Sequence, residues 1–391
     1  MVKSGYKQTE VGIVPEDWEI KQFSQLFIIG HGKDQKGIES KVGKYPILAT
    51  GGVVGYTNSY LWDKPSALIG RKGTINKPQY IDTPFWTIDT LFYTKILDVA
   101  FPKYIYYLFC TIDWLSLNEA SGVPSLSANN IEKIICAVPS FDEQKRIAEA
   151  LSDVDTMISS LEKLIAKKKA VKQGAMQELL TSKKRLPGFD GEWKDFTIGK
   201  MGEFYSGLSG KSKKDFDCGD AYYITFLNVL SNVKIDTSIL ASVDVRENES
   251  QNIVRKGDLF FNTSSETPEE VGMCAVLDEE LENTYLNSFC FGFRLFDDAH
   301  NPLFLSYYLN SSIGRKIMSI LAQGATRYNL SKNNFAETVI KLPTKEEQTA
   351  IASILSDMDN EIETLEQKLE KTRQIKQGMM QQLLTGKIRL V

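Results

Sequence analysis

Residues 126–186 read LSANNIEKIICAVPSFDEQKRIAEALSDVDTMISSLEKLIAKKKAVKQGAMQELLTSKKRL, and residues 330–390 read LSKNNFAETVIKLPTKEEQTAIASILSDMDNEIETLEQKLEKTRQIKQGMMQQLLTGKIRL. The two segments align without a gap at a constant offset of about 204 residues, and nearly half of their positions are identical. Chance does not repeat about sixty residues in register. The chain therefore contains an internal duplication, which decides its architecture.

Each copy predicts one long helix that begins just after a proline. Pro139 marks a boundary, Ser140 is a candidate N-cap, and Glu143 completes a capping-box pattern; Thr344 and Glu347 repeat it. Apolar residues then alternate at spacings of four and three, which predicts the seam of a left-handed coiled coil. The seam residues are Ile147, Leu151, Val154, Ile158, Leu161 and Ile165 in the first copy, and Ile351, Leu355, Met358, Ile362, Leu365 and Leu369 in the second.

Beyond this seam, lysine and threonine occupy the seam positions. The apolar stripe is therefore predicted to shift to Val171 and Ala175 in the first copy and to Ile375 and Met379 in the second.

Charge decides how the two helices are expected to pair. The second half of the first helix is basic, and the first half of the second helix is acidic: Lys163, Lys167, Lys168, Lys169 and Lys172, against Asp357, Asp359, Glu361, Glu363 and Glu366. An antiparallel arrangement places these groups opposite one another, whereas a parallel arrangement opposes Lys167 and Lys371. We expect one intramolecular antiparallel pair; the alternative is that each helix packs only on its own domain.

The predicted order is a globular block, a helix, a second block and a second helix. The expected segments are a first recognition domain over 1–138, a long helix over 139–186, a second recognition domain over 187–342 and a second helix over 343–391. The opening segment also resembles the start of the second half, since Trp18 and Phe23 share their spacing with Trp193 and Ile198. Residues 24–125 and 199–329 are rich in short β-like runs and glycine turns. The predicted class is α+β with a pseudo-two-fold internal repeat.

Composition is that of an ordinary globular protein, with 391 residues, 42% hydrophobic and 25% charged. No apolar run is long enough to span a membrane and no signal pattern opens the chain, so we expect a cytoplasmic protein without membrane contact. The five cysteines are scattered and the histidines number two, which supports neither a zinc site nor a disulfide framework. The net charge of −4 argues weakly against a nucleic-acid partner, although local basic patches are compatible with it.

Catalytic motifs are missing from the sequence. Residues 207–212 (GLSGKS) approach a phosphate-binding loop, but Tyr205 stands where its first glycine belongs. No arrangement of carboxylates, lysines or histidines marks a catalytic, cofactor-binding or metal site. A binding protein is therefore the favoured interpretation.

The turns of both blocks carry groups that suit nucleic acid. Lysine and arginine neutralise phosphates, whereas arginine, asparagine, serine and threonine can read base edges. The candidate DNA-binding residues are Lys33, Lys36, Lys44, Arg71, Lys72, Lys77, Lys211, Lys213, Lys214, Ser264, Ser265, Thr326, Arg327, Tyr328 and Asn329. The loops 122–126 and 324–330 are favoured because both come immediately before the repeat.

The duplicated P-x-x-x-E-Q-x-x-I-A … L-L-T pattern, with Pro15 to Trp18 near the start and Lys387 to Leu390 at the end, resembles the specificity subunit of type I restriction-modification systems. This resemblance implies two target-recognition domains held apart by two antiparallel helices, each domain reading one half of a bipartite DNA sequence. It also implies a non-catalytic chain without a cofactor. Two modification subunits would dock on the helices and bring S-adenosylmethionine, and a restriction subunit that uses ATP can join.

Two other functions remain open at this point. One is a stand-alone DNA-binding adaptor with the same helices but no methyltransferase partner. The other is a coiled-coil scaffold whose globular blocks bind protein. An independent enzyme is the least favoured of the alternatives.

Overall fold

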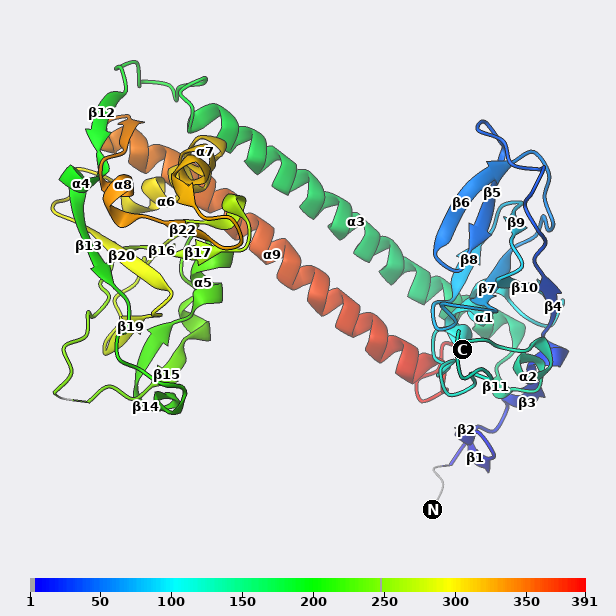
Figure 1. Ribbon diagram of the computed structural model, residues 1–391. Helices are drawn as coiled ribbons and strands as arrows, with labels where there is room; N and C mark the ends of the chain where they lie inside the picture. Colours follow the sequence, from blue (N-terminus) through cyan, green and yellow to red (C-terminus); the bar gives the residue numbers. More distant parts are fainter. Residues whose placement is uncertain (1–3, 247) are drawn as a thin grey trace. The chain divides into compact units, whose positions relative to one another are not determined.

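The computed structural model describes residues 4–246 and 248–391, and the chain forms two compact units (Figure 1). Unit 1 comprises Met1–Lys163 with Glu366–Val391, and unit 2 comprises Leu164–Leu365. Both unit boundaries fall inside the two 39-residue helices, α3 (Phe141–Leu179) and α9 (Lys345–Leu383). Each unit therefore contains a portion of both helices, and the predicted α+β class is confirmed.

Unit 1 is built around a four-stranded sheet with the order β4-β10-β7-β8. Its strands are Phe27–His31, Leu91–Ile96, Ser66–Gly70 and Gln79–Ile81. All five residues of β7 (SALIG) are buried, as expected of an apolar run in an interior strand. A second sheet has the order β6-β5-β9, from Gly52–Thr57, Tyr45–Ala49 and Trp86–Thr87.

Unit 2 repeats this plan with different residues. Its four-stranded sheet has the order β13-β20-β16-β18, from Gly202–Ser206, Cys290–Leu295, Leu259–Asn262 and Cys274–Val276. A second sheet has the order β15-β14-β19, from Ala241–Val243, Phe216–Ile224 and Thr284–Leu286. In both units the central strand of the second sheet pairs antiparallel with one neighbour and parallel with the other. The two dissimilar blocks thus share one topology.

Short elements complete each unit. In unit 1 they are β1 (Tyr6–Thr9), β2 (Gly12–Pro15), β3 (Glu19–Gln22), α1 (Pro102–Phe109), α2 (Ala128–Glu132) and β11 (Ile135–Val138). In unit 2 they are β12 (Lys194–Thr197), α4 (Ile198–Met201), α5 (Phe226–Ser231), β17 (Ser264–Ser265), α6 (Pro302–Asn310), α7 (Ser312–Leu321), β21 (Ala322–Gln323), β22 (Tyr328–Leu330), α8 (Lys332–Ala336) and β23 (Val339–Leu342). The strand that precedes each long helix pairs with an opening segment, β11 with β3 and β23 with β12.

Both long helices begin at the predicted caps. Ser140 Oγ accepts a hydrogen bond from the backbone N–H of Glu143 (3.3 Å), and Thr344 Oγ1 accepts from that of Glu347 (3.5 Å). The reciprocal half of the predicted capping box is wrong for Glu143, because the carboxylate of this residue is bound by Arg389 and Trp18 instead. Helix α3 ends at Leu179, before the predicted limit of 186.

Ion pairs show that the helices run antiparallel within each unit. In unit 1, Asp155 pairs with Lys376 (2.6 Å) and Glu162 with Arg373 (2.7 Å). In unit 2, Lys168 pairs with Glu361 (2.6 Å) and Lys172 with Asp359. As the residue number rises along α3, it falls along α9, so lysines of the first helix meet carboxylates of the second. Because both helices also enter each unit's core, packing of each helix on its own domain alone is excluded.

The predicted seam residues face inward. Seven of them are buried and the others are half-buried: Ile147, Leu151, Leu161, Ile165, Ile351, Leu355 and Ile362, then Val154, Ile158, Met358, Leu365 and Leu369. Coiled-coil geometry itself stays a prediction.

The predicted shift of the apolar stripe is confirmed for Ala175 and Met379, which are half-buried against the cores, and is wrong for Val171 and Ile375, which are half exposed. Lys172 and Lys376 lie in the helix interface instead. In unit 1, Lys376 Nζ lies over the ring of Tyr107 (5.7 Å to the centroid), whose hydroxyl donates to Asp155 Oδ2 (2.7 Å). A lysine can occupy a seam because its aliphatic stem packs against apolar surface while its ammonium reaches a carboxylate.

Unit 2 repeats this arrangement. Lys172 Nζ lies over the ring of Tyr307 (5.4 Å to the centroid), and the Tyr307 hydroxyl donates to Asp359 Oδ2 (2.7 Å). Burial, and then the hydrogen bond to the carboxylate, raise the pKa of Tyr307 well above its usual value, so the phenol remains a donor. We call these two sets the Lys–Asp–Tyr clusters. Each links both long helices to the helix that follows the four-stranded sheet.

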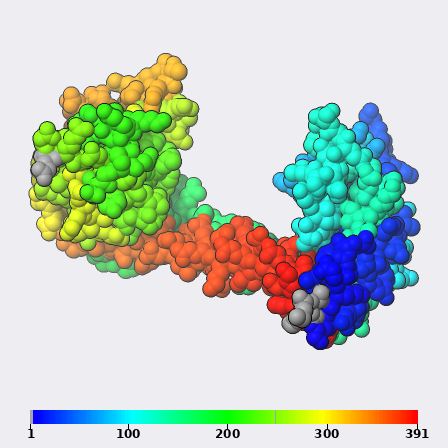
Figure 2. All heavy atoms as spheres, turned by 90° about the horizontal axis from the view of Figure 1, so that it is seen from below, coloured from blue at the N-terminus to red at the C-terminus, as the bar shows by residue number. Residues whose placement is uncertain are grey.

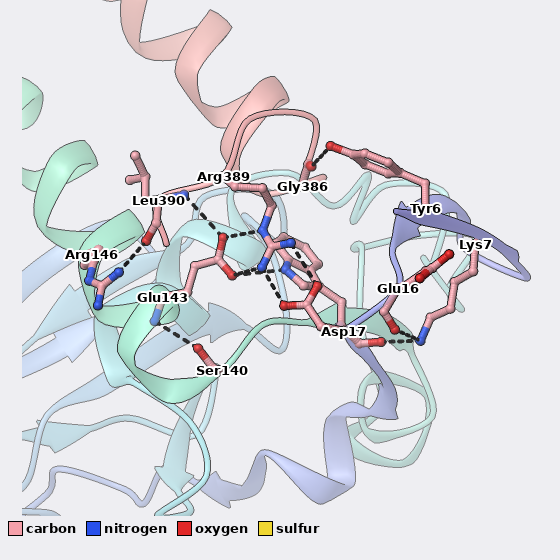
Figure 3. A network of polar contacts seen from close by, with 11 residues as sticks. Tyr6, Lys7, Glu16, Asp17, Ser140, Glu143, Arg146, Gly386, Arg389 and Leu390 are labelled. Carbon is pink, nitrogen blue, oxygen red and sulfur yellow. Dashed lines mark hydrogen bonds and ion pairs between the residues drawn. The ribbon is translucent and has the colours of Figure 1, made fainter. Parts of the chain in front are cut away.

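The C-terminal segment of unit 1 is fastened to the opening segment (Figure 3). Arg389 binds the buried Glu143 carboxylate with Nε (2.7 Å) and Nη2 (2.8 Å), and binds Asp17 with Nη1 (2.8 Å) and Nη2 (2.7 Å). The Trp18 indole N–H donates to Glu143 Oε2 (3.2 Å). Figure 2 shows the C-terminal residues (red) beside the N-terminal ones (blue). The Arg389 hydrogen bond also lowers the pKa of Asp17.

Unit 2 contains the equivalent contact. Arg185 binds the buried Glu347 carboxylate with Nε (2.7 Å) and Nη2 (2.6 Å), and donates to the Gly191 carbonyl (2.7 Å). The repeat therefore duplicates a bidentate arginine–glutamate pair at the end of one long helix and the start of the other. Such pairs combine geometric specificity with charge.

Substitution of Arg389 tests this contact. Arg389→Met leaves the buried Glu143 carboxylate without its cation, which costs about 3–5 kcal/mol in stability. We expect thermal unfolding, followed by circular dichroism, to shift to lower temperature. Arg146→Met is the matched control, because Arg146 only donates to the Leu390 carbonyl from an exposed position (2.9 Å). Equal shifts for both variants would show that the pair with Glu143 contributes no special stability.

Candidate nucleic-acid interface

In unit 1, two separately predicted segments form one surface at the end of strand β7. The Gly73 N–H donates to the Pro124 carbonyl (2.9 Å), and the Leu126 N–H donates to the Arg71 carbonyl (2.9 Å). Lys72 and Ser125 also form an isolated antiparallel bridge. The exposed Lys72 and the half-buried Arg71 therefore lie beside the loop 122–126.

Unit 2 has its candidate residues at the equivalent place, beyond strand β16. Strand β17 pairs antiparallel with β22, with Ser264 opposite Asn329 and Ser265 opposite Tyr328. The loop that precedes each repeat thus packs on the segment that follows the buried central strand. This pairing brings together two groups of candidates that are far apart in sequence, Ser264 and Ser265 on one side and residues 326–329 on the other. Thr326, Arg327 and Asn329 are exposed.

The hydrogen bonds show which candidate residues are free to contact DNA and which hold a neighbouring side chain in place. Ser264 is buried, and its Oγ accepts from Arg327 Nε (3.1 Å), so Ser264 positions the guanidinium instead of presenting its own hydroxyl. Ser265 Oγ donates to Glu270 Oε2 (2.9 Å). Among the described residues, Arg327 pairs with no carboxylate, so its remaining N–H groups can bind a phosphate or a base edge.

The predicted phosphate contact of Lys211 is not supported. Its side chain is only 4% exposed, and its ammonium pairs with Glu249 and donates to the Asp244 carbonyl. The Lys211 hydrogen bond lowers the pKa of Glu249, which keeps this pair charged. Lys213 and Lys214, in the following 3₁₀ turn, are exposed.

The lysines of unit 1 lie on the segments around its second sheet. Lys33, Lys36, Lys44 and Lys77 are all exposed. The Lys33 backbone is tied to strand β9, since its N–H donates to the Thr87 carbonyl (2.8 Å) and its carbonyl accepts from Trp86 Nε1 (3.0 Å). Lys44 Nζ lies over the ring of Tyr45 (5.3 Å to the centroid). Lys33 and Lys44 therefore lie next to this sheet with exposed side chains.

Sequence reasoning missed the hairpin formed by β5 and β6, whose tip exposes Val53 and Val54. The signal was present, because Gly51 and Gly52 mark a hairpin turn after an apolar run. Alternation of side chains would have placed one valine on each face, whereas the structure exposes both.

The described part of the chain contains no candidate metal site, disulfide or membrane-spanning helix. No group of three or more histidine, cysteine, aspartate or glutamate side chains there could hold a metal ion. The five cysteines form no disulfide in the structure. Within residues 4–246 and 248–391, helices that combine the length and apolarity needed to cross a membrane do not occur.

Comparison with known proteins agrees with the duplicated plan. Residues 15–173 and 190–374 each match the model of a family described as "Type I restriction modification DNA specificity domain". The chain is similar to the MjaVIII specificity subunit of a type I restriction enzyme from Methanocaldococcus jannaschii, with 26% identity over 96% of this chain and 94% of the relative. It is also similar to a putative MjaX specificity subunit from that organism, with 24% identity over 99% of this chain and 97% of the relative.

A solved structure shares the fold. The S subunit of a type I restriction-modification system from M. genitalium superposes with a TM-score of 0.66 at 16% identity, over 94% of this chain and 96% of that one.

Three neighbouring lysines provide a test of the interface. Replacing the exposed Lys213 and Lys214 by alanine removes two phosphate contacts, so the slope of log affinity for DNA against log salt should fall by about two. Lys211→Gln is the control, because its ammonium is already bound inside the domain; it should leave the slope unchanged and lower the melting temperature. The opposite ranking of the two variants would refute this assignment.

Proposed function

The chain belongs to the family of type I restriction-modification DNA specificity proteins, and DNA target recognition is the function of that family. We propose that unit 1 and unit 2 each read one half of a bipartite DNA sequence. The observation that carries this proposal is that both units share one topology and place different side chains at the equivalent surface. Arg71 and Lys72 occupy it in unit 1, whereas Ser265, Arg327 and Asn329 occupy it in unit 2.

The chemistry of these side chains suits two unlike half-sites. Lysine contacts phosphate without reading sequence, which fixes the register of the protein on the duplex. Arginine and asparagine form bidentate hydrogen bonds with guanine and adenine in the major groove, worth about 1–3 kcal/mol of discrimination for each good pair. Unit 2 therefore offers more base-reading groups at this surface, and unit 1 offers more phosphate-binding groups.

The long helices have a separate role in this proposal. They set the gap between the half-sites and provide the docking surface for two modification subunits. Support comes from the exposed apolar residues Leu164 and Val171 of α3, which are one heptad apart in unit 2 and suit a partner helix. Exposed apolar residues on one helix face that none of the described residues of the unit cover are typical of an interaction surface.

Catalysis then belongs to the partners. S-adenosylmethionine and the methylating site would be on the modification subunits, and ATP on a restriction subunit where one joins. The chain itself would supply only recognition and geometry. Purified chain that transfers methyl groups to DNA without any partner would refute this division.

A block exchange tests the proposed function. Replacing residues 24–125 with the corresponding block of a relative should change one half of the methylated target and leave the other half and the gap unchanged. The reason is that the two units have separate sheets and separate recognition surfaces. The target is determined by mapping methylated adenines in cells that also produce the modification subunit. A change in both halves of the target would contradict the proposal that each unit reads its half independently. If the correctly folded wild-type chain does not bind DNA, the proposed function is wrong.

A further inference from the structure

The tip of the β5–β6 hairpin in unit 1 presents apolar side chains to the surface. Ala49 pairs with Gly52 across a two-residue turn, and Gly52 has a φ of 109°, which favours glycine. Val53 and Val54 follow, and they are 55% and 54% exposed. Two successive residues of a regular strand point to opposite faces, so the shared exposure needs a cause.

A bulge in strand β6 supplies that cause. Leu48 pairs with Val53 and Ile47 with Gly55, which leaves Val54 without an opposite residue. The partner strand β5 is buried at both of these positions. A bulge of this kind bends the strand and re-aims the side chains next to it.

The hairpin tip is also braced. Gln79 Nε2 donates to the Ala49 carbonyl (2.9 Å) and to the Thr50 carbonyl (3.3 Å). On the other side of β5, strand β9 pairs in parallel, with Leu48 opposite Thr87. These contacts fix the position of β5 and of the turn, and therefore the exposed position of the two valines. An exposed apolar edge strand is a liability for aggregation unless a partner covers it.

Two exposed lysines on segments bonded to the strands of this hairpin and its sheet favour a duplex as the partner. The exposed Lys77 lies two residues before the bracing Gln79, and the Lys33 backbone is bonded to strand β9. Lysines bind phosphates on either side of a groove, while an apolar side chain needs an apolar group on the base edges. In the major groove of B-DNA that group is the C5-methyl of thymine.

Unit 2 argues against a partner that binds both units in the same way. Strand β15 takes the place of β6 in the equivalent sheet. There Ala241 and Ser242 are half-buried and Val243 is buried, and the exposed apolar Leu227 and Ile239 lie in the connection between β14 and β15 instead of on the strand. A partner present in two equivalent copies would use a surface that both units share. An exposed apolar pair on this strand in one unit suits a feature of one half-site.

We propose that Val53 and Val54 contact thymine methyl groups in the half-site read by unit 1. This inference rests on the proposed function, since it names residues that read the DNA. The two valines would then determine specificity for thymine. They would do so through its C5-methyl group, which the polar candidate residues do not recognise.

Deoxyuridine provides the test, because it differs from thymidine only by the missing methyl group. The probe is a duplex that carries the mapped target, with each thymine of this half-site replaced in turn. Wild-type full-length chain, alone and with its modification subunits, should bind at least one substituted duplex about fourfold more weakly, as expected for one buried methyl group. Substitution of thymines in the other half-site is the internal control.

A double variant links the effect to the hairpin. Val53→Ser/Val54→Ser removes every γ-methyl group of the two valines, so it should bind the thymine duplex more weakly and no longer distinguish it from the deoxyuridine duplex. Val42→Ser is the matched control, because Val42 is 89% exposed in the same block. If the double variant fails to fold, the wild-type comparison of thymine with deoxyuridine decides alone.

The outcomes separate the two proposals. Wild-type chain that does not bind the target duplex overturns the proposed function, and this inference with it. Normal binding with no effect of deoxyuridine at any position overturns this inference alone. Loss of a modification subunit from the double variant, without an effect of deoxyuridine, would assign the tip to a protein partner and would also overturn it.

Discussion

The structure depends on the antiparallel pairing of two long helices, and charge fixes that pairing in each unit. Lys172 meets Asp359 in unit 2, and Lys376 meets Asp155 in unit 1. Ion pairs of this kind add little net stability, because desolvation offsets the attraction. They select one orientation and register, since a parallel or shifted arrangement leaves partly buried charges without partners. The tyrosine of each Lys–Asp–Tyr cluster donates a hydrogen bond to the aspartate, which links the paired helices to α1 in unit 1 and to α6 in unit 2.

A consequence is that unit 1 is made from two separate pieces of chain, whereas unit 2 is one continuous piece, 164–365, that contains part of both long helices. Unit 1 needs the C-terminal residues 366–391, and Arg389 fastens them to Glu143 at the start of α3. Unit 2 uses Arg185 and Glu347 in the same way. A duplicated chain that folds back on itself can therefore hold two unlike domains on equivalent supports. For a protein of this DNA specificity family, that arrangement suits the bipartite target that we propose.

Much of this architecture could be predicted from the repeat, because heptad spacing and complementary charge are local patterns in the sequence. The position of Lys172 in the helix interface could not be predicted, because it depends on Tyr307, which lies in α6 and is far from Lys172 in sequence. Lys211 was misjudged for a similar reason: its partner Glu249 is separated from it by several turns and strands. The shared exposure of Val53 and Val54 depends on a bulge, which alternation of residues does not reveal.

The most direct measurement removes one heptad from the middle of each long helix, residues 160–166 and 365–371, and maps methylated adenines in cells that also make the modification subunit. Removing seven residues shortens a helix by about 10 Å, so the gap between the half-sites should shrink by about three base pairs while the bases read stay the same. Deletion from one helix alone should abolish methylation, because the charged pairs lose their register. An unchanged gap after the double deletion would contradict the account.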